Sequence, residues 1–540
     1  MWIADAWFLM DAGKNMQWTV LQGGSMNGAE ALLKTMAAAG IEVCFANGGT
    51  TEMAMILAFD SIAEIRPILG LFEGVCSGAA DGYGRMKEKP ALCLSHLGPG
   101  LANGVANLHN AKRARTPLLN VIGEHASWHG AANAPLAMDI EGLCTTFTGW
   151  QRTVRSVETI ARDTADAIAE ASRGQIASLI VPSDYQWKEY RGEIPIVARF
   201  PCDPPGQRTI ESAAKMLKSV EKTALIMNGR ALRRRGLEAA IRIRAAVGCE
   251  LFCINFPAYV DRGVGLVPVT RVPYFPERAE ALLKSYKAIV LAGTEQPVNF
   301  FGYEGQSSNP IASNVPKLRI DSESQDAAEA LEALADELGA PGKDAVSKIV
   351  AGYDVPGVPS GKLTSEKACT TLAALQPEGA IICDEGLTAS FSYFPLGATL
   401  APHSYFMITG GAIGQGMPSA TGAAVACPDR PVINLQADGS AMYTVQSLWT
   451  QAREGLNVTT LICSNRSYKI INVELQRAGF KNPGPRALSL TDLAKPPIDW
   501  PTLSKGMGVP AVAVDTAEDL AREMKKALRE PGPHLIEMIL

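Results

Sequence analysis

The chain carries Val432-Ile433-Asn434-Leu435-Gln436-Ala437-Asp438-Gly439-Ser440, an apolar β-type run that ends in a polar turn. A helical pattern follows as far as Glu454, Gly455 ends it, and a second β-type run at 458–462 leads to Asn465. This order predicts one strand, helix and strand unit. Because such crossovers are right-handed and make the two strands parallel, Asp438 and Asn465 are expected at the same carboxyl edge of a sheet.

These two strand ends carry the residue types of a metal and phosphate site. The Asp438 carboxylate, the Asn465 amide oxygen and the backbone carbonyl of Ser467 are hard oxygen ligands suited to Mg²⁺. Gly439 permits a tight turn, and Ser440 is expected to open a helix whose N-terminus attracts an anion. The pattern predicts a diphosphate held through Mg²⁺. The alternative is an ordinary turn with a helix cap and no ligand.

Outward from this unit, short apolar runs alternate with helical patterns along most of the chain. Such alternation predicts the α/β class, with three doubly wound parallel-sheet domains in series. Proline-rich or loose passages at 195–206 and 341–361 are expected to be linkers. The expected domains are 26–190, 206–340 and 362–540. Residues 1–25 show no clear period, whereas an amphipathic helical pattern opens at Met26, so we expect residues 1–25 to be an extension from an upstream start rather than part of the native protein.

Length and composition exclude several classes of protein. The 540 residues, 47% hydrophobic and 19% charged, suit three or four globular domains rather than a disordered chain. The net charge of -5 and the lack of a long basic run argue against a nucleic-acid partner. The apolar stretch 2–9 is too short to span a membrane. Eleven cysteines without a C-x-x-C pair indicate a reducing, cytoplasmic compartment.

Several motifs in one order resemble those of thiamin diphosphate (ThDP) enzymes over nearly all of residues 26–540. The chain is most similar to the group that contains acetolactate synthase large subunits and benzoylformate decarboxylase. One departure is Ala437, which stands where the usual G-D-G motif has its first glycine. The shared landmarks are Asp438-Gly439-Ser440 with Asn465, Phe72-Glu73-Gly74, Ala79 to Arg85, Gly98-Pro99-Gly100, Asn107 with the Arg113 to Pro117 turn, and Gly410 to Pro418.

The resemblance assigns cofactor roles to particular residues. It implies a pyrimidine-binding first domain that faces the diphosphate-binding third domain of another subunit, hence a homodimer or homotetramer. Glu73 would be catalytic, hydrogen-bonding the aminopyrimidine. Ile413 would hold the cofactor in its bent shape, and backbone groups of Gly411 and Ile413 would bind the pyrimidine edge. The implied cofactor contacts are Glu73, Thr388, Gly411, Ile413, Gly439, Ser440 and Asn465, and the implied Mg²⁺ ligands are Asp438, Asn465 and Ser467.

Other residues bear on the reaction. His96 matches an active-site histidine of benzoylformate decarboxylase and could relay a proton, and Thr50 matches a hydroxyl that contacts the substrate carboxylate. Two departures limit this likeness: no histidine stands between Pro297 and Tyr303, and Glu474 replaces an expected aromatic wall, which disfavours an unsubstituted aryl substrate.

A further histidine pair lies in the first domain. His125 and His129 could share one helix face, but Glu124-His125 reverses the order of a zinc motif, so we expect no zinc site. His125 stays a secondary candidate for the active cleft.

The expected function is ThDP- and Mg²⁺-dependent decarboxylation of a 2-oxo acid, with transfer of the enamine to a carbonyl acceptor. One alternative is a non-oxidative decarboxylase that releases an aldehyde, which His96 favours. A catalytically silent ThDP-binding paralogue is another, against which Glu73, Asp438 and Asn465 speak. A nicotinamide oxidoreductase is disfavoured, because Ser419 stands where the dinucleotide fingerprint needs its third glycine. FAD is not favoured, since residues 228–230 form no convincing motif for it.

Overall fold

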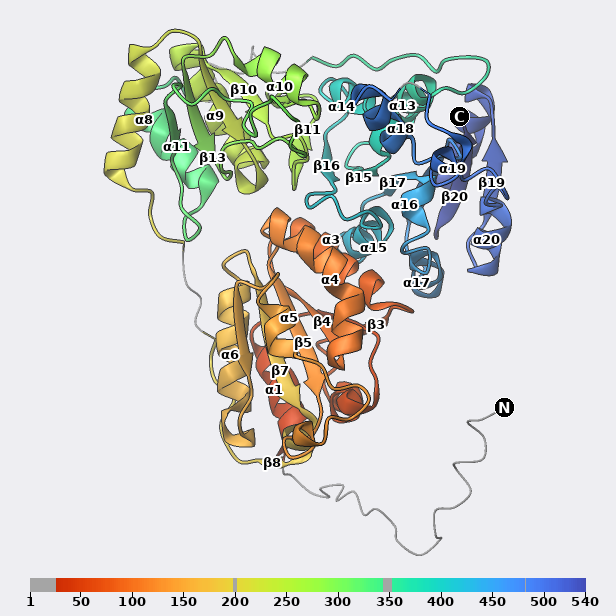
Figure 1. Cartoon of the computed structure of the whole chain (residues 1–540). Helices are drawn as coiled ribbons and strands as arrows, with labels where there is room; N and C mark the ends of the chain where they lie inside the picture. Colours follow the sequence, from red (N-terminus) through yellow and green to blue (C-terminus); the bar gives the residue numbers. More distant parts are fainter. Residues whose placement is uncertain (1–25, 198–201, 343–351, 481) are drawn as a thin grey trace, which may run out of the picture.

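Three parallel sheets follow one another along the chain, each flanked by helices (Figure 1). The computed structural model describes residues 26–197, 202–342, 352–480 and 482–540. The expected extension 1–25 and parts of both expected linkers lie outside the described residues. The α/β class with three parallel sheets in series is confirmed.

The first sheet has the order β3-β2-β4-β5-β7-β6, with every neighbouring pair parallel. Its first helix begins after Asn27 because the Asn27 side chain accepts from the Glu30 N–H while Glu30 accepts from the Asn27 N–H. Two short strands close this domain on itself, since Met26 pairs with Tyr190. The strands are β1 Met26–Asn27, β2 Val43–Ala46, β3 Arg66–Leu69, β4 Ala91–His96, β5 Leu118–Glu124, β6 Trp150–Thr153, β7 Ile176–Pro182 and β8 Glu189–Tyr190. The helices are α1 Gly28–Ala38, α2 Met53–Ala58, α3 Glu73–Lys87, α4 Leu97–Ala114, α5 Ile140–Cys144, α6 Ile160–Ala171 and α7 Ser183–Trp187.

The central sheet has the order β12-β10-β9-β13-β14, again entirely parallel. Two of its three interior strands, β9 and β13, are fully buried apolar runs, because helices cover both faces of this parallel sheet. The strands are β9 Thr223–Met227, β10 Glu250–Cys253, β12 Thr270–Arg271, β13 Ala288–Ala292 and β14 Lys317–Arg319. The helices are α8 Gln207–Ser219, α9 Arg234–Val247, α10 Pro276–Leu283 and α11 Ala327–Glu337.

The third sheet has the order β11-β16-β15-β17-β18-β20-β19. Its edge strand β11 (Val260–Arg262) comes from the central part of the chain and pairs antiparallel with β16. This antiparallel edge strand is the one departure from the parallel arrangement among the described strands of the three sheets. The remaining strands are β15 Ile381–Glu385, β16 His403–Met407, β17 Val432–Ala437, β18 Val458–Ser464, β19 Ala511–Val514 and β20 His534–Ile539. The helices are α13 Ser365–Leu375, α14 Tyr393–Leu396, α15 Gly416–Ala426, α16 Asp438–Ala441, α17 Ser447–Glu454, α18 Lys469–Arg477, α19 Pro485–Leu488, α20 Trp500–Gly506 and α21 Ala517–Ala527.

One expectation needs correction. The helix after β17 begins at Asp438 rather than Ser440 and runs for only four residues before a turn separates it from α17. Gly455 does end α17 as predicted, in the left-handed conformation with φ +62°. Since α16 is a single turn, a strong helix dipole at this place is not available, and the local backbone N–H groups remain the relevant donors.

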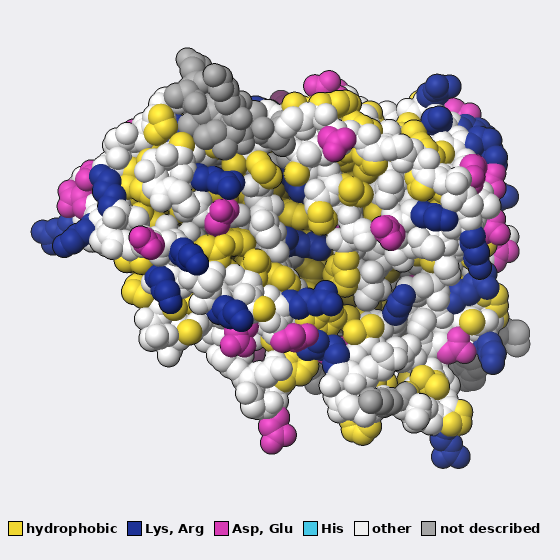
Figure 2. Space-filling model, turned by 90° about the horizontal axis from the view of Figure 1, so that it is seen from above, with side chains coloured by type: hydrophobic (Ala, Val, Ile, Leu, Met, Phe, Trp, Pro, Cys, Tyr) yellow, Lys and Arg dark blue, Asp and Glu magenta, His cyan; other side chains and the backbone are white. Residues whose placement is uncertain are grey.

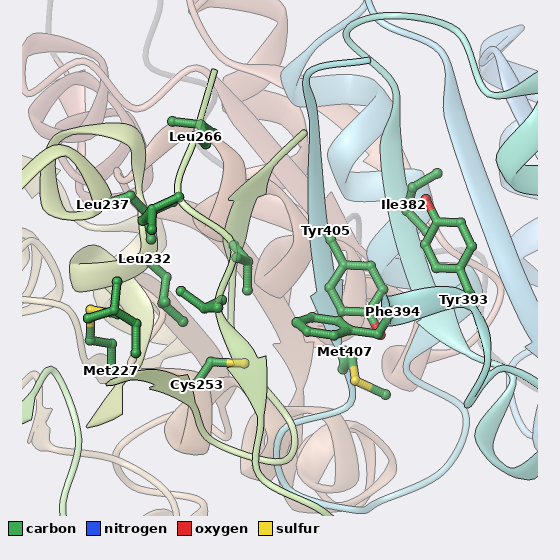
Figure 3. Packing of buried hydrophobic residues seen from close by; sticks show 14 of the residues in the cluster. Met227, Leu232, Leu237, Cys253, Leu266, Ile382, Tyr393, Phe394, Tyr405 and Met407 are labelled. Atoms are coloured by element: carbon green, nitrogen blue, oxygen red, sulfur yellow. The ribbon is translucent and has the colours of Figure 1, made fainter. Parts of the chain in front are cut away.

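One hydrophobic core joins the central and third domains across β11. Buried side chains of the central domain, including Met227 and Cys253, belong to the same cluster as Tyr405 and Met407 of the third sheet (Figure 3). The first domain has separate clusters on the two faces of its sheet. Helices α3 and α15 pack directly together, with a Cβ at Gly422 falling only 1.8 Å from the Ala79 carbonyl oxygen (Figure 1).

The first and third sheets share one topology. In the first sheet, β3 lies on one side of β2, and β4 and then β5 lie on the other side. In the third sheet, β16 lies on one side of β15, and β17 and then β18 lie on the other side. Neighbouring connections therefore leave in opposite directions beside β2 and β4, and again beside β15 and β17. Ligands of open parallel sheets bind outside the carboxyl ends of the strands at such a switch point. The topology thus points to two half-sites, one in each domain.

Candidate functional site

Asp438 and Asn465 lie together at the carboxyl ends of neighbouring parallel strands, as the sequence predicts. Ala437 pairs with Cys463, and the Arg466 N–H donates to Asp438 Oδ2 at 2.6 Å. The Gly439 N–H donates to Asp438 Oδ1 at 2.8 Å. Burial raises the pKa of the Asp438 carboxyl, and these backbone N–H groups oppose the rise. The amides also fix the orientation of the carboxylate and leave it further lone pairs for a cation.

Ser467 and Ser440 lie beside this pair, each already engaged by neighbours. The Ser467 N–H donates to Asn465 Oδ1 at 2.9 Å, which orients that amide, and the Ser467 carbonyl accepts from the Lys469 N–H. The buried Ser440 hydroxyl donates to Ala437 O and accepts from Gln436. Ser440 can therefore offer a ligand its backbone more readily than its hydroxyl.

The donor set of this site fits Mg²⁺ better than a transition metal. One carboxylate, one amide oxygen and a carbonyl are hard oxygen donors, and Mg²⁺ completes its shell with water and phosphate oxygens. Among the described residues, no cluster of three His, Cys, Asp or Glu side chains could hold a metal ion. The residues present thus fit a cation that depends on a diphosphate for its other ligands.

The loop after β16, which carries Gly411 and Ile413, is held from below by a buried carboxylate. Glu385 is fully buried at the end of β15 and accepts from the N–H groups of Gly414, at 2.6 Å, and Gly416. Burial raises the pKa of Glu385 to about 7, and the amide donors, Gly416 first, oppose that rise. Gly411 itself has φ +76°, and a Cβ there would lie 2.5 Å from the Phe300 ring, so only glycine fits.

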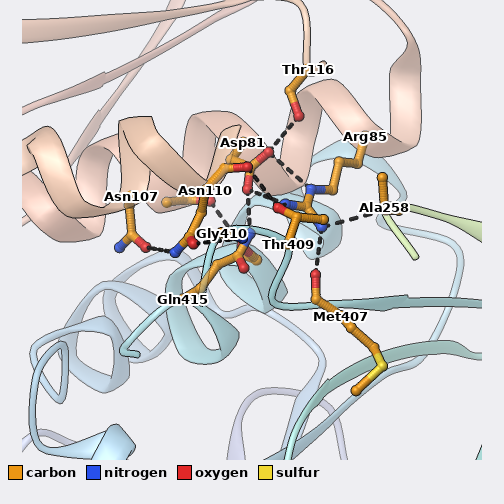
Figure 4. Close-up of polar contacts among 12 residues, drawn as sticks. Asp81, Arg85, Asn107, Asn110, Thr116, Ala258, Met407, Thr409, Gly410 and Gln415 are labelled. Carbon is orange, nitrogen blue, oxygen red and sulfur yellow. Dashed lines mark hydrogen bonds and ion pairs between the residues drawn. The ribbon is translucent and has the colours of Figure 1, made fainter. Parts of the chain in front are cut away.

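The same loop is tied to the first domain by a buried polar network (Figure 4). Arg85 donates to both carboxylate oxygens of Asp81, at 2.9 and 2.7 Å, and to the Met407 carbonyl at 2.7 Å. Gln415 also donates to Asp81. Asn110 accepts from the N–H groups of Gly410 and Ala412 and donates to the Ala412 carbonyl at 2.8 Å. The backbone of residues 410–416 is therefore fixed from both of its sides.

A cavity of about 540 Å³ opens where the central and third domains meet. Thr388, Gly411 and Ile413 line it, so three of the predicted cofactor residues share one space. Apolar side chains gather along the furrow between these domains in the view from above (Figure 2). The other lining residues are Phe256, Tyr274, Phe300, Phe301, Tyr303, Leu387, Phe391, Ile408, Ile470, Ile471, Glu474, Leu475, Ala478 and Phe480.

Glu73 occupies the other half-site, at the start of α3 in the first domain. Its side chain is largely buried, and Asn103 donates to Glu73 Oε2 at 3.0 Å. A Cβ at Gly100 would lie 2.9 Å from Glu73 Oε1 and 3.3 Å from His96 Cβ. Glu73 and His96 are therefore neighbours, and neither belongs to the lining of the cavity formed by the central and third domains.

His96 ends β4 and forms a cluster that the sequence does not reveal. Its Nδ1 lies 2.8 Å from Glu52 Oε2 and 3.0 Å from Thr51 Oγ1. Glu52 is completely buried, and its hydrogen bond raises the pKa of His96, while partial burial of the ring opposes the rise. A Cβ at Gly49 would lie 2.5 Å from the His96 ring. Thr50 is exposed beside this cluster, so its neighbour Thr51 is the threonine that contacts His96.

The secondary candidates form a separate pair. The rings of His125 and His129 are 5.3 Å apart in an edge-to-face arrangement. His125 Nε2 is buried without a hydrogen-bond partner. Neither residue contacts the His96 cluster through the bonds described above.

Glu52 and Glu385 are the site residues that sequence reasoning missed. Each is a buried glutamate whose partners lie far along the chain, at His96 and at Gly414 and Gly416. Glu385 has a local signal, because it ends the buried strand β15, whereas Glu52 lies in a short turn at 50–52, six residues beyond β2, and has no such signal.

Comparisons with known proteins identify the family of this chain. The model of the N-terminal TPP binding domain of thiamine pyrophosphate enzymes matches residues 26–142, and that of the C-terminal TPP binding domain matches residues 392–538. The chain belongs to the family of thiamin diphosphate-dependent enzymes, and the two matched domains are its cofactor-binding domains.

Particular relatives narrow the resemblance. A protein named "Putative acetolactate synthase large subunit IlvX" from Mycobacterium tuberculosis is 45% identical over 521 residues, covering 95% of this chain and 99% of the relative. Benzoylformate decarboxylase from Pseudomonas aeruginosa is 25% identical, covering 92% and 96%. The solved structure of a Rhodococcus jostii RHA1 thiamine diphosphate-dependent 4-hydroxybenzoylformate decarboxylase superposes with a TM-score of 0.83 at 22% identity, covering 95% and 99%. The chain is thus similar to acetolactate synthases and to decarboxylases within this family.

None of the helices in the described parts of the chain is both long and apolar enough to cross a bilayer.

Proposed function

We propose that this enzyme decarboxylates a 2-oxo acid with ThDP and Mg²⁺ and transfers the remaining fragment to a carbonyl acceptor, as a carboligase of acetolactate synthase type. The observation that carries this proposal is the pairing of Asp438 and Asn465 at adjacent strand ends, joined through the Arg466 N–H at 2.6 Å. The relative of acetolactate synthase type at 45% identity supports transfer as the outcome.

Asp438, Asn465 and the Ser467 carbonyl would hold Mg²⁺ and, through it, the diphosphate. Thr388, Gly439 and Ser440 would contact the phosphates, and Gly411 and Ile413 would hold the pyrimidine and the bend. When bound, thiamin diphosphate supplies a carbon nucleophile and an electron sink for the loss of CO₂. The chain's own part is orientation: Glu385 and Asn110 fix the loop that carries Ile413, and the apolar cavity excludes water.

Glu73 would hold a proton at its carboxyl, shared with the ring nitrogen of a cofactor that the third domain of a second chain holds. Glu73 lies in the first domain, outside the cavity lined by Ile413 in its own chain, and this placement supports a site shared between subunits. We therefore infer a homodimer or homotetramer. Light scattering is expected to give at least a dimer; an active monomer would contradict the shared site.

One observation favours a second candidate, a simple decarboxylase that releases an aldehyde. The hydrogen bond from Glu52 raises the pKa of His96 and so favours the imidazolium, which can donate a proton to the carbon that loses CO₂. Thr50, exposed beside this imidazole, would contact the substrate carboxylate.

Free thiols at all eleven cysteines, most of them buried, agree with a reducing, cytoplasmic compartment.

The two candidates separate in one experiment. The purified enzyme with ThDP and Mg²⁺ is given pyruvate, longer 2-oxo acids and arylglyoxylates, alone and with an aldehyde or 2-oxo acid acceptor, and the products are identified by mass. Ligated hydroxyketones or hydroxy acids support the carboligase. Free aldehyde alone supports the decarboxylase, and absence of CO₂ from every donor would leave a cofactor-binding paralogue without this activity.

A further inference from the structure

The cavity beside Ile413 is almost entirely apolar, and Glu474 is the one acidic side chain among the described residues that line it. Phenylalanine rings at 256, 300, 301, 391 and 480 provide flat walls, and Ile470 and Ile471 come from the same helix as Glu474. An aromatic group is well matched to walls of this kind, because rings pack edge-to-face or offset against each other. Phe300 and Phe301 already do so, at a centroid distance of 5.4 Å.

The hydrogen bonds of Glu474 are unevenly distributed between its two oxygens. The Tyr303 hydroxyl donates to Oε2 at 2.9 Å, and Arg477 Nε donates to the same oxygen at 3.3 Å. Oε1 is buried and has no hydrogen-bond partner among the described atoms. A buried acceptor without a partner is costly, so this oxygen is suited to a donor group that arrives with the substrate.

The charges around Glu474 restrict the donor. Arg477 also pairs with both carboxylate oxygens of Glu277, and Arg278 adds a second positive charge near Glu277, so two guanidiniums balance the two carboxylates. A second carboxylate on the substrate could not donate to Glu474 Oε1 and would be repelled by that oxygen. A cation would have to leave water for an apolar lining, which is costlier than burying a neutral hydroxyl. A hydroxyl group on an aromatic ring meets both conditions.

We propose, on the basis of the function proposed above, that the donor is an aryl 2-oxo acid with a ring hydroxyl remote from its 2-oxo group. Glu474 accepts the hydrogen bond of that hydroxyl through Oε1 and thereby sets specificity. Tyr303 and Arg477 are positioning residues, because they hold the Glu474 carboxylate through Oε2.

Paired substrates test this. In the ThDP- and Mg²⁺-loaded enzyme, kcat/KM is measured for 4-hydroxyphenylglyoxylate against phenylglyoxylate, and for 4-hydroxyphenylpyruvate against phenylpyruvate. The wild type is expected to favour the hydroxylated member of at least one pair by about tenfold or more. In Glu474→Leu that ratio is expected to fall to about one or to invert, while Arg477 keeps its pairing with Glu277. Gln476→Leu, an exposed change on the same helix, is the matched control and is expected to keep the wild-type ratio.

A binding measurement separates this inference from the proposed reaction. Calorimetry measures the affinities of 4-hydroxymandelate and mandelate for the wild type, Glu474→Leu and Gln476→Leu. Neither ligand has a 2-oxo group, so neither is decarboxylated. Turnover of aryl 2-oxo acids without any preference that depends on Glu474 would overturn the inference and leave the function standing. A Glu474-dependent preference in binding without CO₂ from any 2-oxo acid would support the inference and overturn the function. If the enzyme shows no Glu474-dependent preference and releases no CO₂ from any 2-oxo acid, both the inference and the proposed function are overturned.

Discussion

Replacing the buried Glu385 by glutamine is expected to change how stability depends on pH. Burial raises the pKa of Glu385 to about 7 from an ordinary 4.5. A raised carboxyl pKa means that the folded state binds the proton more tightly than the unfolded state. The stabilisation is therefore complete below pH 4.5 and is lost as the pH rises through 7.

The size of the effect follows from the two pKa values. The interval between 4.5 and about 7 corresponds to about 3 kcal/mol of unfolding free energy. Glutamine does not ionise, so the wild type is expected to lose about 3 kcal/mol relative to Glu385→Gln between pH 4.5 and pH 8. Taking the difference between variants cancels the titration of all other groups, provided that they do not couple to residue 385.

Urea unfolding followed by tryptophan fluorescence at several pH values, at one protein concentration and without cofactor, measures this difference. Glu366→Gln, an exposed change on α13, is the control and is expected to track the wild type at every pH. A difference between wild type and Glu385→Gln that stays constant, or that grows in favour of the wild type at high pH, would refute the reasoning. It would mean that the amides of Gly414 and Gly416 keep the carboxylate ionised despite its burial.

Three further predictions concern the site. Asp438→Ala is expected to weaken ThDP and Mg²⁺ binding together by about a hundredfold or more, measured by calorimetry and metal analysis; retention of either at native affinity contradicts the Mg²⁺ bridge. Glu73→Gln is expected to bind ThDP within a few fold of the wild type while CO₂ release falls by about 10²-fold or more, and unchanged turnover would remove Glu73 from its role. Glu52→Gln removes the bond that raises the pKa of His96, so the loss of imidazolium, followed by NMR and by the pH profile of aldehyde release, is expected at lower pH than in the wild type; an unmoved His96 titration would contradict the assignment.

Features that depend on local sequence and strand order could be predicted. The Asp438 and Asn465 pairing follows from one strand, helix and strand unit, because parallel strands must end at the same edge. Strand β2, Val43–Ala46, is one of the short apolar runs whose alternation with helical patterns predicts the α/β class. The helix from Gly28 follows from the amphipathic pattern that opens at Met26, and the structure adds the reciprocal capping of Asn27 and Glu30 that fixes its first residue.

Features that depend on tertiary contacts could not be predicted. Glu52 resembles an ordinary charged residue until β2 and β4 pair and bring His96 beside it. The role of Glu385 depends on a loop about 30 residues later in the chain, whose Gly414 and Gly416 N–H groups donate to its carboxylate. The sequence predicts that the helix after β17 continues to Glu454, because its residues have no strong helix-breaking pattern. In the structure α16 is a single turn, and the Asp438 carboxylate accepts from the Arg466 N–H that follows β18, which favours a turn there.

Strand β11 limits where this enzyme can be divided when chimaeras with its relatives are made. Its three residues are encoded inside the central segment yet complete the third sheet, where they pair with β16. A chimaera cut at the apparent boundary near residue 362 would strip β16 of its neighbour and leave a bare hydrogen-bonding edge open to self-association. Exchanges between relatives should therefore move the central and third segments together, and an exchange of the first domain must preserve the contacts of Asp81, Arg85 and Asn110 with residues 407–415.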